Sequence, residues 1–135
     1  MAFRIIKTKL FQRFARKHRI TDDDLVVAVK KAKVGLIDAD LGRRLIKQRI
    51  ARSGQGARKG FRVFIAWQTD ARAVFLYGFP KSERENLDDD ELEDWQDAGE
   101  ILLNLTDDEI DHTIAKGEAL EVTDDEDEDE DEEGV

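Results

Sequence analysis

Hydrophobic residues follow two different periods in the first third of the chain. Residues 3–7 read as a short strand, and the residues after them form a stripe at helical spacing that consists of Leu10, Phe11, Phe14 and His18. Thr21 followed by Asp24 is a variant of the capping box, which predicts that a second helix begins there, and Gly35 predicts its end. The pattern therefore predicts a strand followed by two helices.

Residues typical of β-strands dominate the middle of the chain. Three segments are rich in β-branched and aromatic residues and are separated by short polar stretches: 43–52, 61–67 and 71–79. They predict three sequential strands that pair as an antiparallel meander. In the first strand Lys47 and Arg49 share one face with Leu45, because side chains alternate along a strand. Two cations are thus expected to project from the same face of the sheet.

Helical spacing returns after Pro80. The new stripe consists of Leu92, Trp95, Gly99, Leu102 and Leu103, and residues 88–90 before it are all Asp, which suits the first turn of a helix. Thr106 with Glu109 predicts a further short helix that ends near Gly117. The predicted order is β, α, α, β, β, β, α, α. This order indicates an α+β fold, in which a small antiparallel sheet has helices mainly on one face.

The composition changes after Val122. Residues 124–133 are all Asp or Glu, a composition that cannot bury apolar surface. We therefore expect one domain over residues 1–122 and a disordered acidic tail over residues 123–135.

The charge of the chain is divided in a way that its net charge of −10 conceals. Residues 1–84 hold 21 Lys and Arg against 7 Asp and Glu, whereas residues 85–135 hold 1 against 25. A basic body of this kind attracts phosphates and other polyanions. The chain has no cysteine, which excludes disulfides, a thiol nucleophile and thiolate metal sites. No apolar run approaches the roughly 20 residues of a membrane span, so we expect no membrane contact. We also expect a cytoplasmic protein without metal or cofactor.

Cations are densest along the predicted strands and their loops: Lys47, Arg49, Arg52, Arg58, Lys59, Arg62, Lys81 and Arg84. Like charges on one sheet face repel one another, so a cluster without interleaved acids indicates an anionic ligand. The alternative is a solvated basic surface that pairs with the chain's own acidic helix. The loop 53–61 favours a ligand, because its three glycines let backbone amides approach phosphate oxygens. The loop lacks the Walker spacing, which argues against a nucleoside triphosphate.

Five blocks of sequence stand out along the chain: residues 3–11, 38–42 (DADLG), 47–51 (KQRIA), 59–62 (KGFR) and 77–86 (YGFPKSEREN). In their order and spacing they resemble one branch of the RelE-like toxins from bacterial toxin–antitoxin systems. The resemblance covers about residues 3–122. It implies a small antiparallel sheet with two N-terminal helices, and a cytosolic protein that cuts messenger RNA in the ribosomal A site. It also implies a cognate antitoxin protein as partner, beside messenger RNA and the ribosome.

The resemblance further implies a mechanism without metal, in which a ribose 2′-hydroxyl attacks the adjacent phosphate. The implied catalytic residues are Lys47, Arg49, Arg62 and Lys81, with Lys47 as the candidate for proton transfer, because an Arg side chain stays charged. The predicted RNA-binding residues are Arg52, Arg58, Lys59, Tyr77 and Arg84. The best-studied branch has a Tyr beyond the last strand, where this chain has residues 85–87 (ENL). Tyr77 is either a core residue or a contact for an RNA base.

Two other functions fit the same residues. One is a binding module of the same fold that does not cleave RNA, such as a ParE-like inhibitor of DNA gyrase. The other is a basic nucleic-acid-binding protein whose acidic tail adjusts its affinity, with a steep dependence on salt. The four cations Lys47, Arg49, Arg62 and Lys81 together favour the nuclease.

The acidic run either raises solubility or masks the basic body. If it masks the body, truncation after Val122 is expected to tighten RNA binding, most strongly at low salt, because a tethered polyanion competes at high effective concentration. The measurement is fluorescence anisotropy of a labelled single-stranded RNA at low and at high salt. Equal affinities of the two chains under both conditions would leave solubility as the role of the run.

Overall fold

A six-stranded sheet forms the middle of the molecule, in the order β2-β3-β4-β5-β1-β6. The structure is a computed structural model that describes residues 2–52 and 56–123, with the side chains of 2–51 and 60–123. In chain order the elements are β1 (Arg4–Thr8), α1 (Lys9–His18), α2 (Asp22–Lys33), β2 (Ala39–Asp40), β3 (Leu45–Arg52), β4 (Gly56–Gln68), β5 (Arg72–Pro80), α3 (Asp89–Asn104), α4 (Asp107–Ala115) and β6 (Ala119–Val122). The α+β class and the mainly antiparallel sheet predicted from the sequence are confirmed.

Each of these helices begins at a side chain that caps its first turn. The Thr8 hydroxyl accepts from the backbone N–H of Phe11 at 3.1 Å, so the residue that ends β1 also starts α1. The other three begin with reciprocal capping boxes, which are Thr21 with Asp24, Asp88 with Glu91, and Thr106 with Glu109. The two boxes predicted at Thr21 and Thr106 are confirmed.

The first and the last strand of the sheet lie side by side. β1 pairs in parallel with β5, where Ile6 stands opposite Val74, and antiparallel with β6, where Ile6 stands opposite Glu121. The parallel pairing of β1 with β5 and the strands β2 and β6 are additions to the antiparallel sheet expected from the sequence. Strands of 2 and 4 residues are too short to show an alternation of polar and apolar positions.

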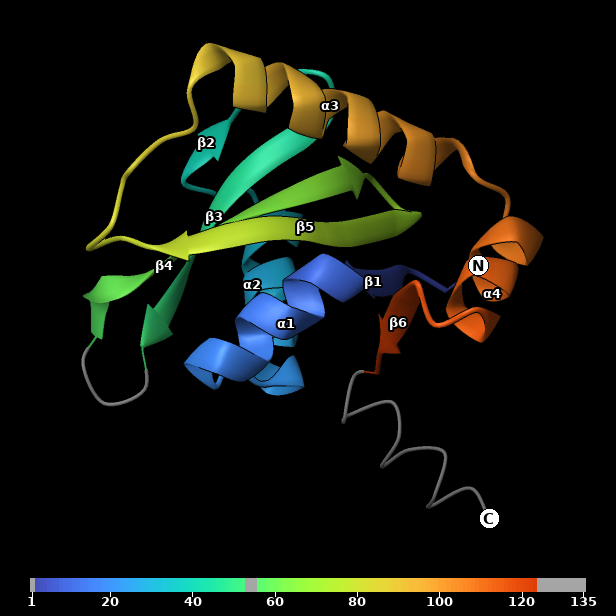
Figure 1. Ribbon diagram of the computed structural model, residues 1–135, viewed down its shortest axis with the longest axis horizontal. Helices are drawn as coiled ribbons and strands as arrows, with labels where there is room; N and C mark the ends of the chain where they lie inside the picture. The colour runs from blue at the N-terminus through green and yellow to red at the C-terminus, as the bar shows by residue number, and fades with distance from the viewer. Residues whose placement is uncertain (1, 53–55, 124–135) are drawn as a thin grey trace.

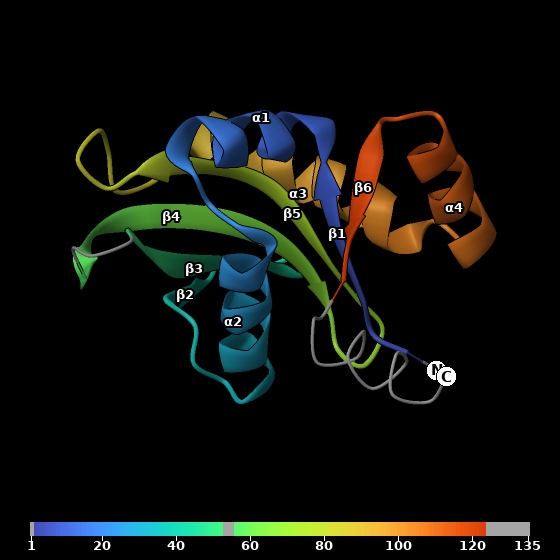
Figure 2. The same ribbon diagram turned by 90° about the horizontal axis from the view of Figure 1, so that it is seen from below.

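Helices cover both faces of the sheet (Figures 1 and 2). On one face residues of α1 and α2 belong to the core cluster that holds Val63 and Ile65, and on the other face residues of α3 and α4 belong to the cluster that holds Phe64 and Ala66. The expectation that the helices lie mainly on one face is therefore wrong. The signal was present in β4, because residues 63–66 form a continuous apolar run, which is typical of a strand buried on both sides.

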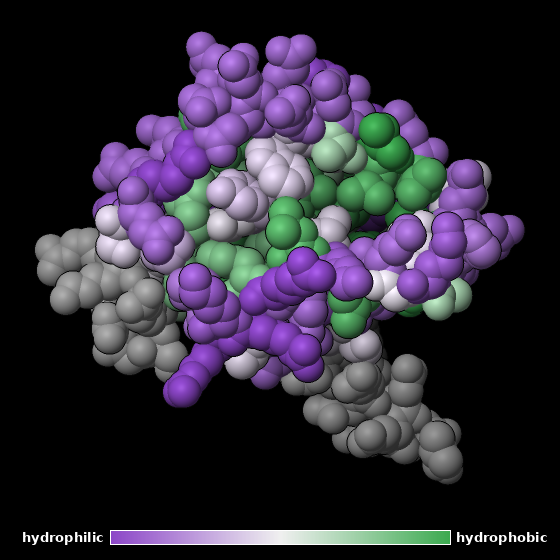
Figure 3. All heavy atoms as spheres, viewed as in Figure 1, coloured by the Kyte–Doolittle hydropathy of each residue, from purple (hydrophilic) through white to green (hydrophobic). Residues whose placement is uncertain are grey.

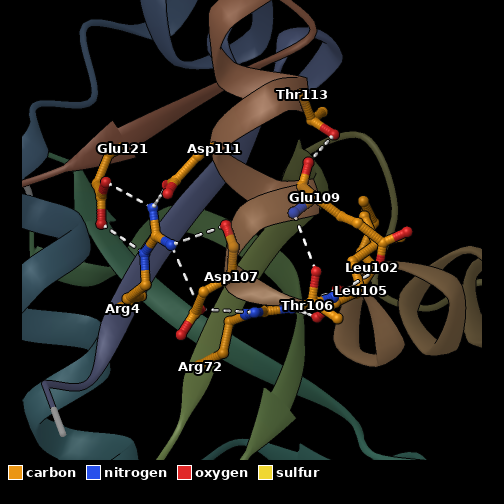
Figure 4. Close-up of polar contacts among 10 residues, drawn as sticks. All are labelled: Arg4, Arg72, Leu102, Leu105, Thr106, Asp107, Glu109, Asp111, Thr113 and Glu121. Carbon is orange, nitrogen blue, oxygen red and sulfur yellow. Dashed lines mark hydrogen bonds and ion pairs between the residues drawn. The ribbon is translucent and has the colours of Figure 1, made fainter.

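Arg72 fixes the end of α3 to the start of β5 (Figure 4). Its Nη1 donates to the carbonyl oxygens of Leu102 and Leu105, each at 2.8 Å, and its Nη2 donates to Oδ1 of Asp107 at 3.0 Å. The last turn of α3 has no basic residue of its own. The buried guanidinium of Arg72 therefore satisfies carbonyl groups at the C-terminal end of this helix.

Arg4 joins α4 and β6 to the first strand (Figure 4). Its guanidinium lies 2.7 Å from Asp111, 2.9 Å from Glu121 and 3.3 Å from Asp107. Hydrogen bonds from Arg72 and then from Arg4 hold the pKa of the Asp107 carboxyl below its usual range. This network connects the C-terminal elements to the sheet.

The substitution Arg72→Met is expected to lower the free energy of unfolding by about 2–3 kcal/mol, because it leaves two inward carbonyl groups without a donor. Urea unfolding followed by circular dichroism measures this loss. Arg43→Met is the matched control, since Arg43 also forms ion pairs, here with Asp97 and Glu100, but has a side chain that is 40% exposed. The loss of unfolding free energy in this variant is expected to be clearly smaller, because an exposed ion pair contributes little to stability. Equal losses in the two variants would contradict the role of Arg72.

Candidate functional site

Three of the predicted cations stand on one face of two neighbouring strands. The register of β3 and β4 places Arg49 opposite Arg62 and Lys47 opposite Phe64. Residues directly opposite each other on antiparallel strands point to the same face, which here is the face covered by α3. The structure therefore brings Lys47, Arg49 and Arg62 together.

Asp38 lies between these three cations. Its Oδ1 is 2.9 Å from Nε of Arg49, and its Oδ2 is 3.3 Å from Nζ of Lys47 and 3.6 Å from Nε of Arg62. The expectation that the cations have no interleaved acid is therefore wrong. We call these four residues, Asp38, Lys47, Arg49 and Arg62, the Asp38 cluster.

The segment that holds Asp38 is tied to β3. The backbone N–H of Asp38 donates to the carbonyl oxygen of Lys47 at 3.0 Å. Gln48 is buried on the opposite face of β3, where its Nε2 donates to the carbonyl oxygens of Ala28 at 3.1 Å and of Leu36 at 2.9 Å. β3 therefore fixes the connection between α2 and β2 from both sides and holds the carboxylate beside the cations.

Burial decides the electrostatics of the cluster. Arg62 is only 5% exposed, and its charge has to be neutralised inside the fold, because an uncompensated buried charge is strongly destabilising. Burial alone would raise the pKa of the Asp38 carboxyl, but hydrogen bonds from Arg49 and Lys47 outweigh it and hold that pKa below its usual range. The carboxylate is therefore charged at neutral pH, and the cluster has three cations against one anion.

The loop between β5 and α3 reaches the same cluster. The Nζ of Lys47 donates to Oδ1 of Asn86 at 2.8 Å. Arg84 donates to the carbonyl oxygen of Asn86 at 2.9 Å and 3.1 Å, and to Glu91 at 3.0 Å. Asn86 and Glu91 were not among the predicted site residues, although Asn86 belongs to the block 77–86 that the resemblance singled out. Arg84 orders this loop and connects it to α3.

The structure describes the contacts of the remaining predicted cations only in part. The backbone N–H of Lys81 donates to the carbonyl oxygen of Gly60 at 3.0 Å, and its side chain has no hydrogen bond or ion pair with another described residue. The side chains of Arg52, Arg58 and Lys59 lie outside the described residues. Their predicted contacts with RNA stay predictions.

Gly60 is required by strand packing. A Cβ atom at this position would lie 2.1 Å from the carbonyl oxygen of Ile50. The strand β4 begins at Gly56, so the segment read as a glycine-rich loop belongs in large part to a hairpin. The close approach at Gly60 is thus between two strands, and it explains this glycine without a ligand.

The sequence blocks at 38–42, 47–51, 59–62 and 77–86 thus contribute the cluster and the loop that contacts it. A family model described as the RelE toxin of the RelE / RelB toxin-antitoxin system matches residues 3–122. The chain belongs to the RelE toxin family. It is a toxin of a toxin–antitoxin system, and membership of the family implies an antitoxin partner. No curated protein matches the chain.

In this RelE toxin Tyr77 is packed and also reaches the surface. Its ring stacks on Trp95, with ring centroids 5.0 Å apart. Tyr77 also lines a groove of about 290 Å³ between α1 and β5, together with Leu10, Phe14 and Phe79. Figure 3 shows a strip of hydrophobic and weakly polar residues between the hydrophilic surfaces of α3 and α1. Contact of Tyr77 with RNA stays a prediction.

Two kinds of feature are absent from the described part of this RelE toxin. No helix there is long and apolar enough to cross a membrane. No group of three or more His, Asp or Glu residues there has the arrangement of a metal site. The acidic residues at 88–91, which precede and begin α3, form its capping box and first turn.

The substitution Arg84→Gln is expected to raise the pKa of Glu91 toward the ordinary value of a glutamate. In the wild-type toxin the hydrogen bond from Arg84, followed by one from the backbone of Asp88, lowers the pKa of Glu91 to about 2. Because this folded-state pKa lies below the unfolded value, the stabilisation is complete above a pH of about 4.5 and is lost as the pH falls through about 2. Titration of the side-chain carboxyl by ¹³C NMR measures the change.

The matched control for this titration is Arg43→Gln, whose side chain pairs with other acids of α3. It should leave the titration of Glu91 unchanged. An unchanged pKa of Glu91 in Arg84→Gln would mean that the ion pair does not form in solution.

Proposed function

We propose that this RelE toxin is an endoribonuclease that cleaves messenger RNA at the ribosome, by attack of a 2′-hydroxyl and without metal. Toxins of the family are generally ribonucleases, which supports the reaction class. The cognate antitoxin, messenger RNA and the ribosome are the proposed partners, and the cytoplasm is the proposed location. The proposal rests on one observation, which is the convergence of three cations in the Asp38 cluster.

The geometry of the cluster suits a phosphodiester. Nitrogen atoms of Lys47, Arg49 and Arg62 all lie within 3.6 Å of one carboxylate, a spacing at which they could equally hold the oxygens of one phosphate. Cations fixed at such distances stabilise the negative charge that develops on the phosphate oxygens in the transition state. The cations need little rearrangement, because β3 and β4 hold them in place before any ligand binds.

The proposed reaction is an internal transfer at phosphorus. The 2′-oxygen forms a bond to the phosphorus atom and the bond from phosphorus to the 5′-oxygen breaks, which gives a cyclic phosphate and a free 5′-hydroxyl. One proton leaves the 2′-hydroxyl and one proton reaches the 5′-oxygen. Lys47 is the proposed proton-transfer group, whereas Arg49, Arg62 and Lys81 are proposed to bind the phosphate.

Primer-extension mapping of a reporter messenger RNA in a bacterial cell-free translation reaction tests the proposal. The wild-type toxin is expected to produce new 3′ ends at codon-phased positions, and these are expected to vanish when initiation is blocked. Arg49→Gln is the preferred variant, because its side chain is 57% exposed and its loss should not disturb the fold. Arg49→Gln and Lys81→Gln are each expected to slow cleavage by about 100-fold or more.

Arg43→Gln is the control for charge, since it removes one cation that lies outside the cluster and pairs with α3. It should cleave at the wild-type rate. An intact message with the wild-type toxin would reject the nuclease. Inhibition of gyrase supercoiling would then indicate the ParE-like function, and salt-dependent binding without cleavage would indicate a nucleic-acid-binding protein.

A further inference from the structure

Asp38 occupies the place that an anionic ligand of the cluster would take. One carboxylate oxygen contacts Arg49 at 2.9 Å, and the other contacts Lys47 at 3.3 Å and Arg62 at 3.6 Å. Two oxygens shared among three cations is also the arrangement in which the non-bridging oxygens of a phosphodiester are bound. Ion pairs of this kind satisfy the cations before RNA arrives.

We propose that Asp38 sets the anion affinity of this site, because its carboxylate competes with an RNA phosphate for the same three cations. A phosphodiester then binds Lys47, Arg49 and Arg62 by displacing Asp38. The inference rests on the proposed function only in the choice of RNA as the ligand. It assigns Asp38 a role in binding and no role in the chemical step.

A ligand can reach the cluster from solvent. A cavity of about 480 Å³ lies at the edge of the sheet and is lined by Asp38 and Arg49, with Leu36 and Gln48 beside them. The side chain of Arg49 is 57% exposed, whereas that of Asp38 is 12% exposed. An approaching phosphate therefore meets the guanidinium of Arg49 first and the carboxylate directly behind it.

Asp38 can leave the cations without unfolding the strands. It lies in the connection between α2 and β2, and its backbone N–H is held by the carbonyl oxygen of Lys47. Within the described part of the chain, the ion pairs of its carboxylate are those with the three cations. A rotation about the side-chain bonds is thus enough to move the carboxylate toward the cavity.

Competition from the Asp38 carboxylate is expected to favour ligands with several phosphates over ligands with one. A carboxylate held in the same chain acts at a high effective concentration, so a single free phosphate competes with it poorly. A polyanion with several phosphates displaces it more readily, because its other phosphates bind the surrounding cations at the same time. The cluster should therefore discriminate RNA from inorganic phosphate and from mononucleotides.

The substitution Asp38→Asn tests the competition in the full-length chain. The probe is a labelled single-stranded RNA with 2′-O-methyl groups, which cannot undergo the proposed cleavage, so binding is measured apart from activity. Loss of the competing charge is expected to tighten binding at least about tenfold at low salt, with a smaller gain at high salt. Binding of inorganic phosphate, measured by NMR of the Arg side chains, should also become detectable.

Asp40→Asn is the matched control. It removes the same charge two residues away, at an exposed side chain whose Oδ1 accepts from the backbone of Gly42 at 2.9 Å. Its RNA affinity should stay within about twofold of the wild type, as expected for a screened surface charge. Unchanged or weaker binding by Asp38→Asn, or an equal gain in both variants, would overturn the proposal. If Asp38→Asn binds RNA more tightly but the wild-type toxin cleaves no message, the competition by Asp38 stands and only the proposed nuclease activity is rejected.

A second measurement uses the wild-type chain and does not depend on a variant that folds. In the free protein the neighbouring cations hold the pKa of the Asp38 carboxyl low. When a phosphate takes over Lys47, Arg49 and Arg62, the displaced carboxyl is expected to titrate at a higher pH. A ¹³C NMR titration with and without the RNA measures this shift, and an identical pKa in both states would refute displacement.

Discussion

Two buried arginine side chains constrain the face of the sheet that α3 and α4 cover. Arg62 and Arg72 are both nearly inaccessible, and they lie at opposite ends of the apolar core of that face. A buried guanidinium needs a countercharge and acceptors for its N–H groups within the fold. Asp38 meets this need for Arg62, and Asp107 with the end of α3 meets it for Arg72. The position of the end of α3 and the presence of Asp38 in the cluster thus both meet the need to neutralise a buried guanidinium.

This requirement gives the cations of the cluster two roles. They hold the connection after α2 against β3 through Asp38, and they are the cations that we propose bind a phosphate. Cations that are already fixed by an internal ion pair lose little conformational freedom when a ligand replaces that ion. The cluster is therefore preorganised, and the cost of preorganisation is the affinity lost to the internal carboxylate.

The sequence was sufficient for several features whose residues are close along the chain. The capping boxes at Thr21 and Thr106 join residues three positions apart, and the shared face of Lys47 and Arg49 follows from the alternation of a single strand. The countercharge for Arg62 depends on the register of β3 and β4 and on the path of the chain after α2. Neither quantity can be read from local spacing, so Asp38 was recognised as part of a sequence block and not as a partner of the cations.

The position of β1 has a consequence for the order in which the chain assembles during synthesis. β1 pairs with β5 on one edge and with β6 on the other. The first strand of the chain can therefore complete its pairing only after β5 and β6 have been synthesised. Strands β2 to β5 pair with their neighbours in sequence and can form while later residues are still being added. The meander that contains the cations is therefore the first part of the sheet able to form. The N-terminal strand is enclosed only when residues 119–122 have emerged from the ribosome.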